Sequence, residues 1–217
     1  MVKRTIVLLG GGFSEGDTND SLDEFLLNSV ECRKPNICFI PTASGDSRGY
    51  IERFYTSFRK YFCETTHLEL FRRTELNLEK FIRNQDIIYV GGGNTANLLA
   101  IWRLHGLDRI IREVYHSGTT LAGISAGAAC WFEGCMTDSF GSLSVLNDGL
   151  GLLPGSFCPH YNTELDRPKR FIHAIQSGAL PQGVALDDGV AARYCNESLD
   201  KIYRCNKGVN LHKQGEM

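Results

Sequence analysis

The feature of this sequence that most constrains its fold is a series of short apolar runs, most of which end at a glycine- or proline-containing turn. Uninterrupted apolar runs of this length are typical of strands that are buried on both faces of a parallel sheet. Four runs before Cys130 fit this description and are predicted to be strands: Thr5–Leu9, Ile37–Ile40, Asp86–Val90 and Thr119–Ile124. His67–Leu70 is a further candidate strand.

Between these runs lie segments whose apolar residues recur at intervals of three and four, the spacing of an amphipathic helix. We expect helices over Leu22–Val30, Tyr50–Phe62 and Thr95–His116. Strand and helix that alternate in this way predict an α/β fold, with a doubly wound, mostly parallel sheet flanked by helices. In such a sheet, ligands bind beyond the carboxyl ends of the strands, where three glycine-rich turns of this chain are expected.

After about Cys130 the pattern changes to short β-like segments, which a helical stretch at Arg167–Ile175 precedes. We expect these segments to be antiparallel strands that extend the same sheet: Gly183–Leu186, Val190–Cys195 and Lys201–Cys205. A chain of 217 residues is long enough for one sizeable core and short for two ordinary domains. The sequence therefore predicts one α/β domain over residues 1–217.

Charge and hydropathy exclude several classes of protein. The formal net charge is −2, with no long basic run, which argues against nucleic acid or an anionic membrane surface as a partner. The apolar stretch Ile6–Leu9 is too short for the core of a signal peptide, and no stretch approaches the ~18 apolar residues of a membrane span. The sequence predicts a cytoplasmic protein.

Eight cysteines occur without the spacing of a metal site. Several lie in apolar runs, such as Cys38 within Ile37–Ile40 and Cys130 before Trp131. We interpret them as free thiols that act as small core residues in a reducing compartment. Neither a metal nor an organic cofactor is predicted.

The strongest functional signal is Gly123-Ile124-Ser125-Ala126-Gly127, a G-x-S-x-G sequence between a predicted strand and a predicted helix. Such a turn lifts the serine hydroxyl above the sheet and makes Ser125 a candidate nucleophile. The amide of Ala126 is then placed to donate to an oxyanion. The competing interpretation is a tight turn without chemistry.

A second signal is Gly91-Gly92-Gly93-Asn94-Thr95, which follows another predicted buried strand. Its glycines let the backbone approach a ligand closely, so the Gly92 amide is the candidate second oxyanion donor and Asn94 a candidate substrate-binding residue. A phosphate-binding turn or a plain loop is the alternative. The turn matches neither common nucleotide-binding glycine motif, and the same holds for Gly10–Gly12.

A serine nucleophile needs a base, most often a histidine, and an acidic group that orients it. Of six histidines we favour His160, because Pro159 before it suits a loop that presents a ring to a neighbouring site. For the acid we favour Asp138, with Glu133 as a rival. Asp148 also lies between Ser125 and His160, but Asn147-Asp148-Gly149 is typical of a turn.

In order and spacing, Gly91–Thr95, Gly123–Ala128 and Pro159-His160 together resemble the peptidase E family, which includes aspartyl dipeptidases and, more distantly, cyanophycinases. The resemblance implies a fold related to class I glutamine amidotransferases and a Ser-His-acid triad. The family serine and histidine map to Ser125 and His160, and its acid lies closest to Asp138. Its oxyanion donors map to Gly92 and Ala126.

The resemblance further implies cleavage of small peptides, including dipeptides with an amino-terminal aspartate. Arg167 and Arg170 are candidates to bind the substrate carboxylate, since guanidinium matches carboxylate geometry, although both can equally be solvated helix charges. Alternatives are an esterase, a cyanophycin-type peptidase, or a non-catalytic binding protein on this scaffold; a glutaminase is disfavoured because it would need cysteine at position 125. The partners expected are a small peptide and, as an assembly to test, a homodimer.

Overall fold

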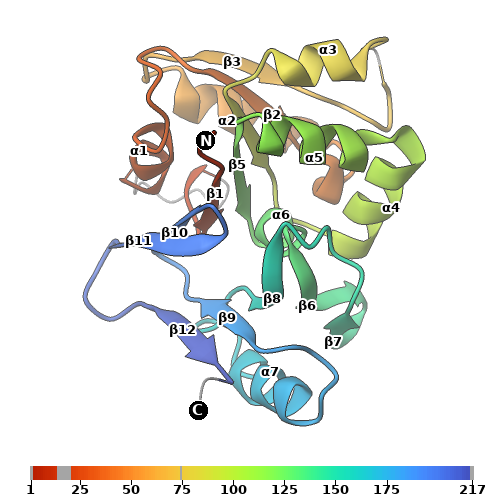
Figure 1. Ribbon diagram of the computed structural model, residues 1–217, viewed down its shortest axis with the longest axis vertical. Coiled ribbons are helices and arrows are strands. Elements are labelled where there is room, and N and C mark those ends of the chain that lie inside the picture. The colour runs from red at the N-terminus through yellow and green to blue at the C-terminus, as the bar shows by residue number, and fades with distance from the viewer. Residues whose placement is uncertain (1, 14–20, 74, 216–217) are drawn as a thin grey trace.

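The computed structural model describes residues 2–13, 21–73 and 75–215, which form two β-sheets and the helices around them (Figure 1). The first sheet has seven strands in the order β11-β10-β1-β5-β4-β2-β3, and the second has five in the order β12-β9-β8-β6-β7. The strands of the first sheet are β1 (Thr5–Leu9), β2 (Asn36–Ile40), β3 (Glu64–His67), β4 (Ile87–Val90), β5 (Thr120–Ile124), β10 (Val190–Cys195) and β11 (Ser198–Arg204). Those of the second are β6 (Phe132–Phe140), β7 (Ser142–Leu146), β8 (Leu153–Cys158), β9 (Gly183–Leu186) and β12 (Leu211–Gln214).

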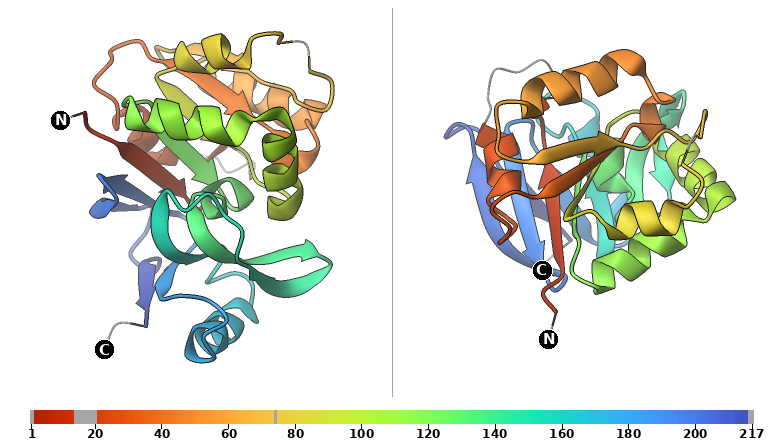
Figure 2. Two further views of the ribbon diagram at one scale, coloured as in Figure 1. Left: turned by 45° about the vertical axis from the view of Figure 1, so that its right-hand side comes forward. Right: turned by 90° about the horizontal axis from the view of Figure 1, so that it is seen from above.

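The first sheet is buried on both faces, because alternate residues of its strands point into two separate apolar clusters. Phe39 and Tyr89 pack with α1 (Ser21–Leu27) and α2 (Arg48–Phe58) on one face. Cys38 and Ile88 point to the other face, which α3 (Leu78–Arg83), α4 (Thr95–His105) and α5 (Leu107–His116) cover. Figure 2 shows the helices on the two sides of the sheet. The predicted doubly wound α/β class is therefore confirmed.

Five adjacent strands of this sheet, β1 to β5, are all parallel, and β10 and β11 extend it beyond β1 with antiparallel pairing. Strand β5 pairs with β1 on one side and with β4 on the other. The turns after β4 and β5 therefore emerge side by side at one edge. Both carry the glycine-rich motifs that the sequence singled out.

The second sheet corrects one prediction. Residues Gly183–Leu186 form β9, which pairs with β8 and β12 and does not extend the first sheet. A Cβ on Gly183 would lie 2.1 Å from the carbonyl oxygen of Ser156, so the glycine permits this close pairing. The chain returns to the first sheet only at β10. Short apolar strands carry no local signal for the sheet that they join, which is why the sequence could not separate the two.

Two further boundaries differ from expectation. The stretch Thr95–His116 is two helices, because Gly106 has a φ of 68° and its N–H ends α4 by donating to the carbonyls of Arg103 and Trp102. The strand expected at His67–Leu70 lies earlier, at Glu64–His67. There it forms the edge strand β3, which pairs with β2. In the described part of the chain, no helix has the length and apolar character needed to cross a membrane.

Candidate active site

The site is built around Ser125, which lies between the end of β5 and the first residue of α6 (Ala126–Ala129). Its backbone has φ 52° and ψ −114°, a conformation that is uncommon and strained for a residue with a side chain. Only glycine fits the flanking positions, because a Cβ on Gly123 would lie 2.0 Å from the carbonyl oxygen of Gly127. A Cβ on Gly127 would lie 2.2 Å from the carbonyl oxygen of Val90. The turn therefore has the close packing of a nucleophile elbow.

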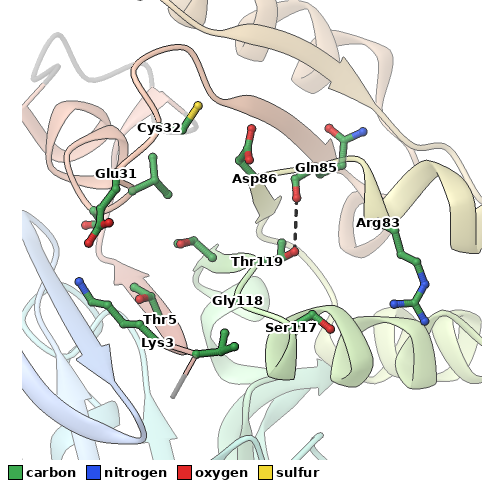
Figure 3. Close-up of a pocket in the computed structure, with 14 residues that line it drawn as sticks. Lys3, Thr5, Glu31, Cys32, Arg83, Gln85, Asp86, Ser117, Gly118 and Thr119 are labelled. Carbon is green, nitrogen blue, oxygen red and sulfur yellow. Dashed lines mark hydrogen bonds between the residues drawn. The ribbon is translucent and has the colours of Figure 1, made fainter.

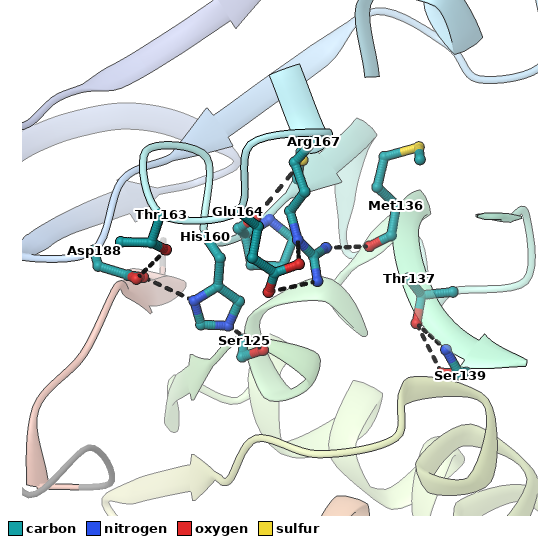
Figure 4. Close-up of polar contacts among 11 residues, drawn as sticks. Ser125, Met136, Thr137, Ser139, His160, Thr163, Glu164, Arg167 and Asp188 are labelled. Carbon is teal, nitrogen blue, oxygen red and sulfur yellow. Dashed lines mark hydrogen bonds and ion pairs between the residues drawn. The ribbon is translucent and has the colours of Figure 1, made fainter. Parts of the chain in front are cut away.

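His160 reaches this serine from the loop after β8. Its Nε2 lies 2.8 Å from Ser125 Oγ, as Figure 4 shows. Its backbone is also in the left-handed region, with a φ of 53°. Ser125 and His160, whose side chains are in contact, thus both have a positive φ, which is unfavourable for residues with a side chain. Such strain is typical of functional sites, where the surrounding fold maintains it.

The other ring nitrogen of His160 contacts Asp188, with 2.8 Å between Nδ1 and Oδ1 (Figure 4). Thr163 Oγ1 donates to the second carboxylate oxygen at 2.7 Å, and the Asp188 N–H donates to Asn162 Oδ1 at 2.8 Å. Burial raises the pKa of Asp188, but the hydrogen bonds from His160 and Thr163 outweigh it, so the pKa lies below its usual 3.8. An ionised Asp188 accepts from Nδ1–H and leaves Nε2 free to accept the serine proton.

The structure thus corrects the predicted acid. Asp138 lies exposed on β6, and the hydrogen-bond partner of His160 is Asp188. Glu133, the rival, accepts a 2.9 Å hydrogen bond from the Gly155 N–H. Both predicted candidates lie between Ser125 and His160 in the sequence, whereas the carboxylate that bonds to His160 follows it, at Asp188.

Asp188 lies in the turn between β9 and β10, and the glycines after β1 allow this turn to approach the site. A Cβ on Gly10 would lie 2.2 Å from the carbonyl oxygen of Asp187. The Gly10 N–H donates to the Val190 carbonyl at 2.7 Å. The sequence signal was Asp187-Asp188-Gly189 beside a third glycine-rich turn, but alone it looks like an ordinary turn.

The two predicted oxyanion donors lie beside Ser125. The Ala126 amide is the first of α6, where an N–H has no acceptor within the helix. A Cβ on Gly92 would lie 3.3 Å from Ser125 Cβ, which shows how closely the two turns approach. The Gly92 N–H donates to the Tyr50 hydroxyl at 3.2 Å. An oxyanion bound here would accept from the same N–H that Tyr50 now uses.

The three predicted substrate-binding residues all have partners within the protein. Asn94 caps α4, accepting from the Asn97 N–H at 2.8 Å and donating to the Ser139 carbonyl at 3.0 Å. Arg167 is buried, with its guanidinium 2.7 Å from Glu164 (Figure 4). Arg170 donates to the Leu143 carbonyl at 3.0 Å. Their predicted role in binding substrate stays a prediction.

A cavity of about 420 Å³ lies at the opposite edge of the first sheet (Figure 3). It is lined by residues at the amino ends of the central strands, among them Thr5, Asp86 and Thr120. Among the described residues that line it there is no histidine, whereas the carboxyl edge carries the linked serine and imidazole. The carboxyl edge is therefore the candidate active site.

Comparison with known proteins gives consistent matches. The sequence profile of Peptidase family S51 matches residues 6–202. The chain is 46% identical to the uncharacterized peptidase YgaJ of Bacillus subtilis (strain 168), over 98% of this chain and 92% of that protein. It is 28% identical to the peptidase E of Pasteurella multocida (strain Pm70), over 99% and 87% of the two chains. A solved peptidase from an acI-B1 Actinobacterium has the same fold, with a TM-score of 0.68, 20% identity, and coverage of 98% of this chain and 95% of that one.

Proposed function

The chain belongs to peptidase family S51 and is a serine-type peptidase, and on this basis we propose that it cleaves small peptides with Ser125, His160 and Asp188 as its catalytic triad. The observation that carries the proposal is the unbroken line of hydrogen bonds from Ser125 Oγ through the His160 ring to the Asp188 carboxylate. Both bonds are 2.8 Å long, within the range for proton transfer by a general base.

In the proposed mechanism, His160 Nε2 takes the proton of Ser125 Oγ as the oxygen attacks the peptide carbonyl carbon. The amides of Ala126 and Gly92 donate to the resulting oxyanion. His160 then returns the proton to the leaving amine, the C–N bond breaks, and an acyl-enzyme remains. Water, deprotonated by His160, attacks the ester carbonyl. His160 then returns this proton to Ser125 Oγ as the ester C–O bond breaks and the carboxylic acid product leaves. Asp188 holds the ring in the required tautomer and stabilises its charged form.

For the substrate we propose dipeptides with an amino-terminal aspartate, which the resemblance to peptidase E supports. Such a preference needs positive charge near the site. The charge of Arg167 contributes to the lowered pKa of Asp188, so its field extends to the triad. Glu164 occupies the Arg167 guanidinium and compensates most of its charge, so we expect Arg167 to bind a substrate carboxylate only by exchanging Glu164 for it. Arg170 is exposed and directed at Leu143, so it is the weaker candidate.

The triad is tested with a fluorophosphonate, which forms a covalent adduct with an activated serine. We expect one adduct on the wild-type protein, located on Ser125 by peptide mass spectrometry, and none on Ser125→Ala. The matched control is Ser139→Ala, which removes a hydroxyl that hydrogen-bonds to Thr137 and not to a histidine. Labelling of Ser125→Ala at the wild-type rate would refute the proposal.

The substrate is tested separately with a panel of Asp-X dipeptides, a β-Asp-Arg dipeptide and simple acyl esters. Fastest turnover of Asp-X dipeptides, lost in Ser125→Ala, supports the proposed preference. Faster turnover of the β-Asp-Arg dipeptide or of the esters would instead assign a cyanophycin-type peptidase or an esterase. Intact folding without labelling or turnover would indicate a binding protein on this scaffold.

A further inference from the structure

The last strand of the second sheet, β12, carries side chains that contact the sequence neighbours of two triad residues. His212 Nε2 lies 3.1 Å from each carboxylate oxygen of Asp187, the residue before Asp188. The same imidazole packs against the ring of Tyr161, the residue after His160, with 4.8 Å between the ring centroids. Gln214 Nε2 also donates to the Tyr161 hydroxyl at 3.1 Å.

On the acid side, Asp187 depends on these contacts. Its side chain is only 5% exposed, and a buried carboxylate requires hydrogen-bond donors. The donors are His212 and the Asn210 N–H, at 2.8 Å from Oδ2. The Asp187 N–H in turn donates to the Asn210 carbonyl at 3.1 Å. The direction of the Asp187 side chain is therefore fixed by β12, and with it the turn that presents Asp188.

On the base side, Tyr161 follows a residue whose backbone is in the left-handed region. A residue with a φ of 53° keeps that conformation only where its surroundings determine it. The Tyr161 N–H donates to the Leu186 carbonyl at 3.2 Å, and its ring is held between His212 and Gln214. One imidazole thus contacts both the segment that carries the base and the segment that carries the acid.

We propose that His212 is a positioning residue, which fixes the separation of His160 and Asp188 by bonding to Asp187 and packing on Tyr161. The proposal rests on the triad proposed above. It assigns no contact with substrate to His212. Outer partners of metal-binding histidines change metal affinity or activity by about 10- to 100-fold when they are removed, and by analogy we expect an effect of this size.

The test compares His212→Gln with His212→Asn. Glutamine carries its Nε2 as many bonds from Cα as histidine does, so it can still donate to Asp187, whereas the asparagine amide is one bond shorter. With a fluorophosphonate probe, we expect His212→Asn to lower the maximal inactivation rate by about tenfold or more, with unchanged probe affinity. We expect His212→Gln to recover most of that loss. The control on the same strand is Lys213→Gln, at an exposed position. We expect this variant to have the wild-type inactivation rate.

Thermal melts of each variant set the assay temperature well inside the folded range. An inactivation rate of His212→Asn equal to that of the wild type would overturn the proposal. So would equal losses in His212→Asn and His212→Gln, which would indicate a structural role. Should His212→Asn fail to fold, Asp187→Asn replaces it, with the same loss expected and an unchanged rate again contradicting the proposal. Ser125→Ala is labelled in parallel: an adduct there refutes the triad itself, whatever His212 does.

Discussion

His160 and Asp188 are joined by a 2.8 Å hydrogen bond although the aspartate follows the histidine by 28 residues. In the proposed triad, the order along the chain is therefore nucleophile, base, acid. In many hydrolases with a G-x-S-x-G turn the acid precedes the histidine. Here it comes from the turn between β9 and β10, where the chain passes from the second sheet to the first.

The first prediction separates Asp188, the acid of the proposed triad, from Asp138, the acid that the sequence favoured. We expect Asp188→Asn to lower kcat by at least about a hundredfold, because an amide cannot hold the His160 tautomer or stabilise its charge; the equivalent change in a well-studied triad costs about 10⁴. Asp138→Asn, at an exposed position without a contact to His160, should stay within about threefold of the wild type. Steady-state turnover of the best dipeptide measures both. The opposite ranking would restore Asp138 as the acid.

The second prediction concerns acid stability. The pKa of Asp188 lies below 3.8 in the folded protein, since the hydrogen bonds from His160 and Thr163 outweigh the effect of burial. A lowered carboxyl pKa stabilises the folded state above the unfolded-state pKa, and this contribution disappears as the pH falls through the folded-state pKa. The difference in Tm between wild type and Asp188→Asn should therefore be constant from about pH 5 to 7 and shrink below about pH 4. A difference that grows on acidification would contradict the lowered pKa.

The third prediction compares two glycines. We expect Gly123→Ala to lower the free energy of unfolding by at least about 1–3 kcal/mol, because its Cβ would overlap the Gly127 carbonyl in a packed core. Gly49 lies in α2, where a Cβ would meet only the far end of Arg53, at 3.9 Å. Gly49→Ala should be neutral or stabilising by up to about 1 kcal/mol. Urea denaturation followed by circular dichroism measures both, and equal tolerance of the two changes would contradict the close packing at the elbow.

The fourth prediction concerns the thiols, all eight of which are free in the structure. Burial raises the pKa of Cys38, Cys135 and Cys158 to about 12, so these thiols are protonated near neutral pH. Cys32 is exposed. With iodoacetamide at about pH 8, Cys32 should react first and the three buried thiols only after denaturation. Rapid native-state alkylation of Cys135 or Cys158 would show that the second sheet opens.

The parts of the site that sequence could locate are those that a local motif encodes. The elbow at Ser125 needs its two glycines within five residues, and Pro159 marks the His160 loop, so both residues could be found without a structure. Asp188 could not, because its role depends on the pairing of β10 with β1 and on the approach of Gly10 to its turn. Both are contacts between distant parts of the chain.

The same contrast holds for the fold. The parallel strands β1, β2, β4 and β5 could be predicted because burial on both faces makes them largely apolar, as in Ile87–Val90, whereas the polar edge strand β3 was placed wrongly. Strands β6 and β7 were missed because they mix buried and exposed residues and include glycine, serine and aspartate. The break at Gly106 was missed because the apolar spacing continues across it, from Trp102 to Leu107 and Ile111.

The proposed triad draws on both sheets, and this has a consequence for the newly made protein. Ser125 follows β5 of the first sheet, His160 follows β8 of the second, and Asp188 lies where the chain returns from one to the other. Under the proposed mechanism, a ribosome that has completed the elbow has made a serine with neither base nor acid. The hydroxyl gains its reactivity only when the chain has emerged beyond Asp188 and the two sheets have docked, so a chain that stops before Asp188 cannot act as a protease on its neighbours.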